Sequence, residues 1–377
     1  MRQPEDELTA LEQASLRRKL PGHDRSLVNF SSNDYLGLTT HPRLISVNQQ
    51  AVEKYGVGST ASRLVCGTAP PHRDLESTLA EAKGTEAALS FSTGYATSIG
   101  VLTAILRKGD TVILDKLCHA SLIDGARMSG ATIRVFPHNH LEKLSDLLVT
   151  TTRDTAPDSR VLVVTESIFS MDGDAAALEE ICNLTNNHDV LLMVDEAHAL
   201  GVRGPTGMGL AEELGLSSQI DFHMGTLGKA AGVAGGYLAA DQRWINLLVN
   251  QARSFIYSTA PPPAQAAVAT EALNLIRGEE GAALRKQLWH NIRLFQQAVG
   301  IKDESQSTII PWMVGDTDTA LTLSAELRKN GLLVPAIRYP TVPRNTARLR
   351  ITINAAHSAE EIQKLATCLM VGTPTLE

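Results

Sequence analysis

The sequence predicts an α/β protein whose large domain is built on a mostly parallel, seven-stranded sheet, followed by a smaller α+β C-terminal domain. Two observations lead to this fold class. From about residue 85, short apolar runs alternate with stretches of helical spacing, which is the pattern of repeated βαβ units. The runs are apolar on both faces, as strands are when helices cover both sides of a parallel sheet.

Seven apolar runs are expected to form the large sheet. They cover residues 87–91, 111–115, 132–136, 161–166, 190–196, 221–226 and 235–240. The spacing of apolar residues also predicts helices, which cover residues 94–106, 119–128, 140–149, 176–187 and 242–253. The first four of these helices lie between the first five runs and supply the crossovers that parallel strands need.

Three segments are expected along the chain: an N-terminal arm over 1–40, a large domain over 41–262 and a small domain over 263–377. In the arm, Leu8, Leu11 and Leu16 recur at helical spacing among charges, which predicts an amphipathic helix over residues 5–19. The prolines at 261–263 mark the boundary of the small domain. Beyond them we expect one long helix over about 264–298 and three apolar runs, at 307–314, 331–337 and 347–354.

The composition excludes several classes of protein. The 34 basic and 41 acidic residues are interspersed, so no basic stripe is available for nucleic acid. The N-terminus carries charges throughout, and no stretch has the length of a membrane span. The cysteines are too widely spaced for a metal cluster or a redox pair: Cys66, Cys118, Cys182 and Cys368. We therefore expect a cytoplasmic protein with reduced thiols, no bound metal, and no nucleic-acid or membrane partner.

Polar side chains follow three of the predicted strands directly. Asp195 directly follows the apolar residues 190–194 and His198 comes three residues later, and Ser170 comes shortly after the run at 161–166. Thr226 and Lys229 lie in a loop of small residues after the run at 221–226. Ligands of open parallel sheets bind beyond the carboxyl ends of the strands, so these positions are the first candidates for a site.

Lys229 is the strongest single candidate. A lone lysine is usually a solvated surface charge. Lys229, however, lies among glycines and alanines with no other charge between Asp221 and Asp241, which predicts a partly desolvated ammonium with a lowered pKa. Such an amine is nucleophilic toward an aldehyde, which indicates a Schiff-base lysine for pyridoxal 5'-phosphate (PLP).

Other residues suit the same cofactor. A buried carboxylate at Asp195 would keep the PLP ring nitrogen protonated, although an aspartate that caps a turn is an equally good reading of Asp195 alone. His198 and Ser170 could donate to the phenolic oxygen of the ring. Gly94 and Tyr95 begin a helix whose free N–H groups suit a phosphate. His119 begins another helix, where a histidine is more often a structural cap but could stack on a flat ring.

The order of the sequence blocks resembles the α-oxoamine synthases, PLP enzymes of the aspartate-aminotransferase-like fold type I that join an amino acid to an acyl thioester with loss of carbon dioxide. The resemblance spans nearly the whole chain. It runs from NFSSNDYLGL through STGYATS, DKLCHASLIDGAR, VVTESIFSMDGD, LMVDEAHALGVRGPTGMG and MGTLGKAAGVAGG to AIRYPTVPRNTARLRITINAAHS.

The resemblance implies a role for each matching residue. It makes Lys229 the Schiff-base lysine and general acid/base, Asp195 the partner of the ring nitrogen, and His119 the ring that stacks on the cofactor. It places the backbone of Gly94 and Tyr95, together with Thr226, near the phosphate, and Ser170 and His198 near the phenolic oxygen. It also implies that Arg350 binds the carboxylate of the amino acid, with Arg17, Asn33, His119 and Thr352 as further substrate contacts.

The block AIRYPTVP resembles the family members that condense L-alanine with a pimeloyl thioester in biotin biosynthesis. The resemblance also implies a homodimer. The acyl carrier can be coenzyme A or an acyl-carrier protein. A family member that uses glycine or serine as its amino acid, or a short or long acyl chain, is the alternative function. Two departures from the family, at Thr60–Ser62 and Tyr339, bear on the preference for the acyl chain.

Two other classes of protein are alternatives to this assignment. Residues 56–61, GVGSTA, formally fit the glycine fingerprint of a nicotinamide enzyme, but the segment before them has helical spacing where the fingerprint needs a strand. A non-catalytic relative that keeps only the fold would be signalled by loss of Lys229 or Asp195. Both residues are present.

Overall fold

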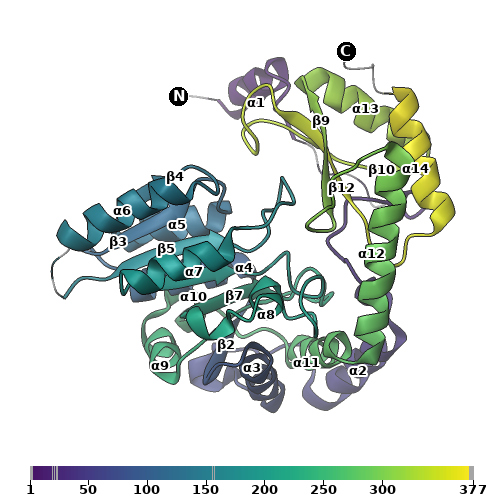
Figure 1. The fold of residues 1–377 in the computed structure, drawn as a ribbon. Helices are drawn as coiled ribbons and strands as arrows, with labels where there is room; N and C mark the ends of the chain where they lie inside the picture. Colours follow the sequence, from purple (N-terminus) through teal and green to yellow (C-terminus); the bar gives the residue numbers. More distant parts are fainter. Residues whose placement is uncertain are drawn as a thin grey trace. The chain divides into compact units, whose positions relative to one another are not determined.

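The computed structural model describes residues 3–18, 20, 22, 24–154, 156 and 158–372. The chain divides into two compact units, each described here by itself (Figure 1). The larger unit comprises residues Asn33–Ser170 and Asp174–Leu288. The smaller unit comprises Met1–Ser32, Met171–Gly173 and Trp289–Glu377.

A seven-stranded sheet forms the centre of the larger unit, as the sequence predicts. Its order is β2-β8-β7-β6-β5-β3-β4, and only β8 runs antiparallel to its neighbours. The strands are β2 (Ala87–Phe91), β3 (Thr111–Asp115), β4 (Thr132–Phe136), β5 (Val161–Glu166), β6 (Leu191–Asp195), β7 (Phe222–Thr226) and β8 (Gly236–Ala240). The parallel strands β5, β6 and β7 therefore end at one edge, in Glu166, Asp195 and Thr226.

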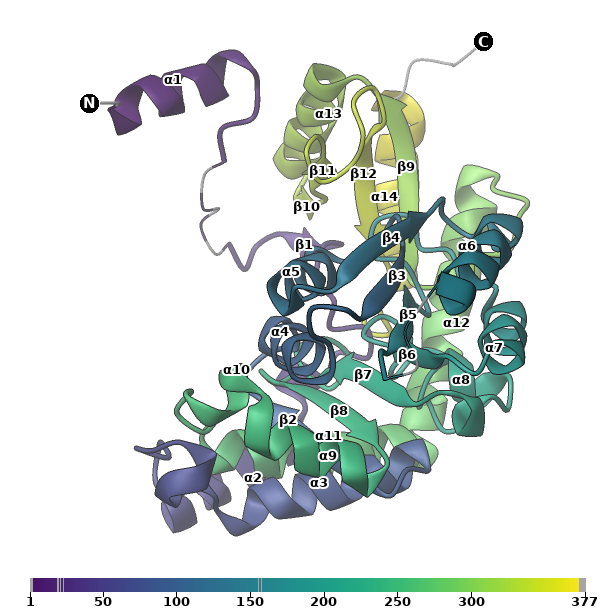
Figure 2. The same cartoon turned by 90° about the vertical axis from the view of Figure 1, so that its left-hand side faces the viewer.

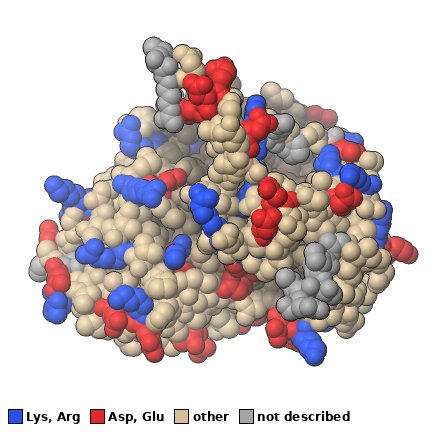
Figure 3. Space-filling model, turned by 90° about the horizontal axis from the view of Figure 1, so that it is seen from above, with Lys and Arg blue, Asp and Glu red and all other residues tan. Residues whose placement is uncertain are grey.

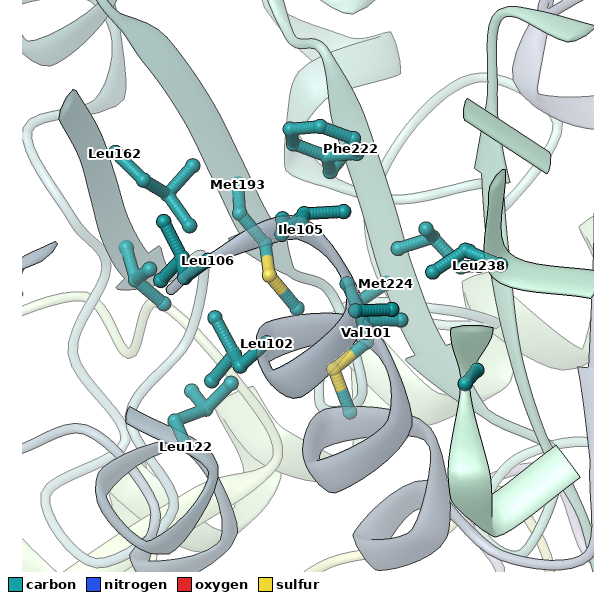
Figure 4. Close-up of a cluster of buried hydrophobic side chains, with 14 of the residues drawn as sticks. Val101, Leu102, Ile105, Leu106, Leu122, Leu162, Met193, Phe222, Met224 and Leu238 are labelled. Carbon is teal, nitrogen blue, oxygen red and sulfur yellow. The ribbon is translucent and has the colours of Figure 1, made fainter. Parts of the chain in front are cut away.

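Helices cover both faces of this sheet. On one face pack α4 (Gly94–Ile105), α5 (Ala120–Ser129) and α9 (Gln242–Gln251), and Figure 4 shows Val101, Leu102 and Ile105 of α4 against Met193 of β6 and Met224 of β7. The other face carries α6 (Leu141–Asp154), α7 (Leu178–Asn187) and α8 (Leu210–Glu213), which bury a second apolar cluster. Burial on both faces explains why central strands such as β3 and β5 are mainly apolar, whereas the edge strand β4 is largely exposed.

The remaining helices of the larger unit group beside the β2–β8 edge. They are α2 (Pro42–Tyr55), α3 (Pro70–Lys83), α10 (Arg253–Ile256) and α11 (Pro263–Arg277). Figure 2 shows α2, α3 and α11 together, in agreement with the contacts of α11 with both other helices and of α3 with β2. The glycine-containing segment 56–61 follows helix α2 and not a strand, so it lacks the strand-to-helix turn of a nicotinamide site.

The smaller unit contains a three-stranded antiparallel sheet in the order β11-β12-β9. Its strands are β9 (Ile309–Gly315), β11 (Ala336–Ile337) and β12 (Ala347–Thr352), and β1 (Val28–Asn29) pairs separately with β10 (Leu332–Leu333). The helices are α1 (Pro4–Gln13), α13 (Thr317–Lys329) and α14 (Ala359–Gly372). Helix α12 (Glu279–Val299) contributes residues to both units.

The structure differs from the sequence prediction in one helix of the C-terminal part, and its compact units divide at a different residue from the predicted domain boundary. The single helix expected over 264–298 is wrong, because Gly278 adopts an extended conformation (φ −84°, ψ −177°) that ends α11 before α12 begins. The division between the compact units falls after Leu288, whereas we expected a boundary at residue 262. The predicted domains stay a prediction, since contacts define compact units but not independent folding.

Candidate active site

Lys229 lies in the loop of small residues that follows β7. Lys229 is half-buried: Ala230 and Ala231 after it are 1% and 0% exposed, whereas Gly228 before it is exposed. The Lys229 Nζ atom is 2.7 Å from Nε2 of His198, which follows β6. The structure thus brings together the lysine and the histidine that the sequence placed after two different strands.

Tyr35 completes the surroundings of His198. Its hydroxyl is 2.5 Å from Nδ1 of His198, and both side chains are buried. The hydroxyl of Tyr35 also donates to Oδ1 of Asn33 at 3.3 Å, which places this predicted substrate residue beside the same group. Both ring nitrogens of His198 are therefore engaged, and its ring is fixed between Lys229 and Tyr35.

Asp195 is the last residue of β6 and is 6% exposed. Its Oδ1 atom accepts the N–H of Ala197 at 2.9 Å, so the carboxylate does cap the turn that leads to His198. The sequence had allowed this turn-capping role as the alternative for Asp195. The bond to Ala197 uses only Oδ1 and does not involve the other carboxylate oxygen, Oδ2. The cap and a role toward a cofactor are therefore compatible.

Glu166 is a second buried carboxyl beside Asp195. The two residues are paired in register on the adjacent parallel strands β5 and β6. Burial and, after it, the charge of Asp195 raise the pKa of Glu166 to about 8, so this carboxyl carries a proton at neutral pH. Its Oε1 atom accepts the backbone N–H of His119 in a very short hydrogen bond.

His119 is the N-cap residue of α5, as its position in the sequence suggested. Its Nδ1 atom accepts the N–H of Ser121 at 3.2 Å and lies 2.8 Å from the Ser121 hydroxyl. Burial lowers the pKa of His119, and the charge of Lys229 acts in the same direction while Asp195 opposes it. The ring is therefore neutral at pH 7, which suits stacking on a flat ring more than binding an anion.

The N-terminus of α4 lies against Thr226. A Cβ atom on Gly94 would come within 3.3 Å of the Thr226 Cβ, so the close approach of helix and strand depends on the missing side chain. Thr93 caps the helix by accepting the N–H of Ala96 at 3.0 Å. The N–H groups of Gly94 and Tyr95 belong to the first turn, which offers donors to an anion.

The other predicted residues are placed as follows. Ser170 is half-buried and ends the first segment of the larger unit, and the Tyr95 hydroxyl points to Asp124 at 2.6 Å. Arg350, Thr352 and Arg17 belong to the smaller unit. There, Arg350 is 5% exposed and its Nη1 donates to the Thr352 hydroxyl at 3.0 Å, while Arg17 pairs with Glu12 at 2.7 Å. Their contacts with a substrate stay a prediction.

Neither Tyr35 nor Glu166 was given a role from the sequence, although Glu166 stands among the polar residues that follow the run at 161–164. Tyr35 lies in the block NFSSNDYLGL, and nothing in its spacing links it to a histidine more than 160 residues further along the chain. Glu166 ends an apolar run, as Asp195 does, so the same strand-end argument could have singled it out.

The raised pKa of Glu166 predicts that stability depends on pH. In the unfolded chain this carboxyl loses its proton near pH 4.5, whereas the folded protein keeps it to about pH 8. The folded state binds more protons in this window, so the free energy of unfolding should fall as pH rises, by at most about 1.4 kcal/mol per pH unit. Glu166→Gln removes this contribution, and its urea-unfolding free energy should vary less than that of the wild type between about pH 5 and pH 8. Parallel curves for the two proteins would contradict the assignment.

The fold and the cluster of Lys229, His198 and Asp195 at the strand ends define a recognisable class of protein. The chain belongs to the aminotransferase class I and II family, whose model matches residues 25–369. The family and the fold class predicted from the sequence are confirmed.

Named relatives make the similarity more specific. The chain is 44% identical to the 8-amino-7-oxononanoate synthase of Pelobacter propionicus, over 94% of this chain and 90% of the relative. Among solved structures, it resembles serine palmitoyltransferase from S. paucimobilis with a bound compound of PLP and myriocin (TM-score 0.89, 29% identity, 98% and 96% of the two chains). It also resembles the 8-amino-7-oxononanoate synthase of Francisella tularensis (TM-score 0.78, 26% identity, 93% and 97%).

Two features of the described part of the chain bear on nucleic-acid and membrane partners. Figure 3 shows Lys and Arg side chains scattered among Asp and Glu on the face it presents, without a continuous basic stripe. Among the residues that the structure describes, no helix is long and apolar enough to cross a membrane.

Proposed function

We propose that the chain is a PLP-dependent acyltransferase that condenses L-alanine with a pimeloyl thioester to give 8-amino-7-oxononanoate, a step of biotin biosynthesis. The observation that carries the chemistry is the Lys229 amine at 2.7 Å from His198, on the loop of small residues after β7, with Asp195 at the end of the neighbouring strand β6. The identity of the substrates is supported by the similarity to named 8-amino-7-oxononanoate synthases at 44% identity.

The residues of the larger unit fit PLP. The cofactor needs an amine, a carboxylate for its ring nitrogen and donors for its phosphate, and the strand ends supply Lys229, Asp195 and the first turn of α4. Position 236 on β8 must be glycine for this turn to pack against the strand, because a Cβ on Gly236 would lie 2.7 Å from the backbone nitrogen of Gly94. The N–H groups of Gly94 and Tyr95, with Thr226, would hold the phosphate, and Ser170 and His198 the phenolic oxygen.

When bound, PLP supplies an electron sink for the carbon atom that carries the amino group. Lys229 would remove the Cα proton of L-alanine and later return a proton to the product. Asp195 would hold the proton on the ring nitrogen, and His119 would cover one face of the ring. A bond then forms between the alanine Cα and the thioester carbonyl carbon, the C–S bond breaks to release the thiol, and the alanine carboxylate leaves as carbon dioxide.

The substrate residues are part of the same proposal. Arg350 would bind the alanine carboxylate with its planar guanidinium, and Arg17, Asn33, His119 and Thr352 would contact the substrates. Asn33 is supported by its hydrogen bond from Tyr35, which reaches His198. Arg17, Arg350 and Thr352 rest on the family resemblance.

We also propose a homodimer. The larger unit exposes several large apolar side chains on loops around the second and tenth helices: Val57 (82%), Val65 (78%) and Tyr257 (72%). Apolar surface of this kind is typical of an interface. Light scattering of the purified protein should give twice the chain mass, and a monomer at micromolar concentration would contradict this part of the proposal.

A substrate panel tests the identity of the reaction. We expect the highest kcat/KM for L-alanine with pimeloyl-CoA or pimeloyl acyl-carrier protein, and at least about 10-fold lower values for glycine, L-serine, acetyl-CoA and palmitoyl-CoA. Carbon dioxide and free thiol should appear in equal amounts. If L-serine with palmitoyl-CoA were the best pair, the protein would act like the serine palmitoyltransferases it resembles, and the proposed substrates would be wrong.

A further inference from the structure

A buried cluster of charged and polar residues lies in the larger unit and has no part in the proposed reaction. It consists of Lys83 at the end of α3, Glu196 directly after β6, His223 on β7 and Tyr237 on β8. All four are buried, with exposures of 4% or less. Burying an ion pair costs desolvation energy, so such a pair at the end of a catalytic strand calls for an explanation.

The centre of the cluster is an ion pair between Lys83 and Glu196. The Lys83 Nζ atom donates to Glu196 Oε2 at 2.7 Å, makes a very short hydrogen bond to the carbonyl oxygen of Met208, and lies 5.9 Å from the centre of the Tyr237 ring. The other carboxylate oxygen, Oε1, accepts the N–H of Ala211 at 3.0 Å. The pair thus ties α3 and the loop before α8 to the residue that follows Asp195.

Both partners are ionised. Burial is the largest single influence and would lower the pKa of Lys83, but the charges of Glu196 and Tyr237 and the hydrogen bonds to them together raise that pKa. Burial likewise opposes ionisation of Glu196, yet Lys83 lowers its pKa below the ordinary value. His223 remains neutral, since burial lowers its pKa to about 4. The pair therefore keeps its charges across the pH range of ordinary enzyme assays.

Glu196 fixes the turn that carries Asp195 and His198. Its N–H donates to the carbonyl of Met224 on β7 at 2.9 Å, and its carbonyl accepts the N–H groups of Ala199 and Leu200, each at 3.0 Å. Ala211, which donates to the Glu196 carboxylate, belongs to the apolar cluster on the α6–α8 face, whereas Met193, which shares the side of Asp195 on β6, packs on the α4 face. Glu196 is therefore held from the side opposite Asp195. Gly209 packs so closely that a Cβ there would lie 2.2 Å from Glu196 Oε1.

We propose that the Lys83–Glu196 pair is a positioning element of the active site, which fixes from behind the turn that aims Asp195 at the cofactor ring and His198 at Lys229. The proposal rests on the proposed PLP chemistry. Neither residue touches the reacting atoms. Their effect is to set where the Asp195 carboxylate and the His198 ring stand.

The test compares single and double variants of the PLP-loaded protein. Lys83→Met leaves Glu196 buried without its partner, whereas Lys83→Met with Glu196→Met removes both charges, a change that often leaves stability intact. We expect both variants to shift the pH midpoint of the visible PLP band by about half a pH unit or more, because Asp195 and His198 set that titration. We also expect kcat to fall about 10- to 100-fold with little change in the KM for L-alanine.

The outcomes distinguish a role of the Lys83–Glu196 pair in positioning Asp195 and His198 from a role in the stability of the fold alone. As a control, Arg203→Met breaks the Arg203–Glu213 pair near the same loop (2.7 Å) and should lower the melting temperature without moving the midpoint. If the double variant regains both the wild-type midpoint and kcat, the pair is only structural and the proposal is overturned. If the double variant fails to fold, Glu196→Gln decides, because it removes the carboxylate charge and keeps the size of the side chain, and an unshifted midpoint there also overturns the proposal. A wild type without a PLP band would instead remove the proposed function.

Discussion

The Lys229→Ala variant should lose the visible absorbance of bound PLP, and its kcat should fall by about 10³-fold or more. The alanine removes the amine that holds the cofactor and also the group that moves the Cα proton, so two contributions are lost together. The measurement is an absorbance spectrum of purified protein after added PLP, with steady-state rates for L-alanine and pimeloyl-CoA.

Lys143→Ala is the matched control for that experiment. Lys143 is on α6 of the same unit, and its side chain is 49% exposed, 4.0 Å from Asp146. This variant should keep the PLP band and the wild-type kcat. A Lys229→Ala protein that retains the band and turns over like the control would show that another amine holds the cofactor.

Asp195→Asn should still bind PLP, but kcat should fall by about 10²- to 10³-fold, the cost typical of removing one preorganised electrostatic partner. The amide keeps the size of the side chain and its bond to Ala197, but it cannot hold the positive charge on the ring nitrogen. The electron sink is then weaker, so proton removal from L-alanine slows. Exchange of the Cα proton of L-alanine with deuterated water, measured without the thioester, reports this step directly.

Asp110→Asn is a control for the loss of a buried carboxylate. Asp110 is 2% exposed and precedes β3, where it accepts the N–H groups of Arg107 and Arg160, each at 2.8 Å. It lies at the amino ends of the strands, opposite the edge that carries Asp195. This variant should lose stability but keep the exchange rate, and equal rates for Asp195→Asn and wild type would contradict the role of Asp195.

The fold could be predicted well because its signals are local. Most strands of the large sheet are short, mainly apolar runs, and residues 87–91, 111–115, 132–136 and 161–166 match β2 to β5. The break between α11 and α12 was missed because apolar spacing continues through it. Only the extended backbone of Gly278 reveals that one helix stops and another begins.

The site was predictable where chemistry follows a strand end. Lys229 and His198 were named from such positions, and the structure brings them to 2.7 Å. Tyr35 and Lys83 could not be found in this way, because each reaches the site region through a contact between segments more than 100 residues apart. Side-chain contacts of this range depend on packing that no local pattern records.

The most direct test of the account is to find which lysine carries the cofactor. PLP-loaded protein would be reduced with sodium borohydride, digested, and analysed by mass spectrometry for a lysine that carries the reduced pyridoxyl phosphate group. We predict that the modified peptide contains Lys229 and that prior incubation with L-alanine lowers its yield. Modification of a different lysine in a catalytically active preparation would contradict the central claim.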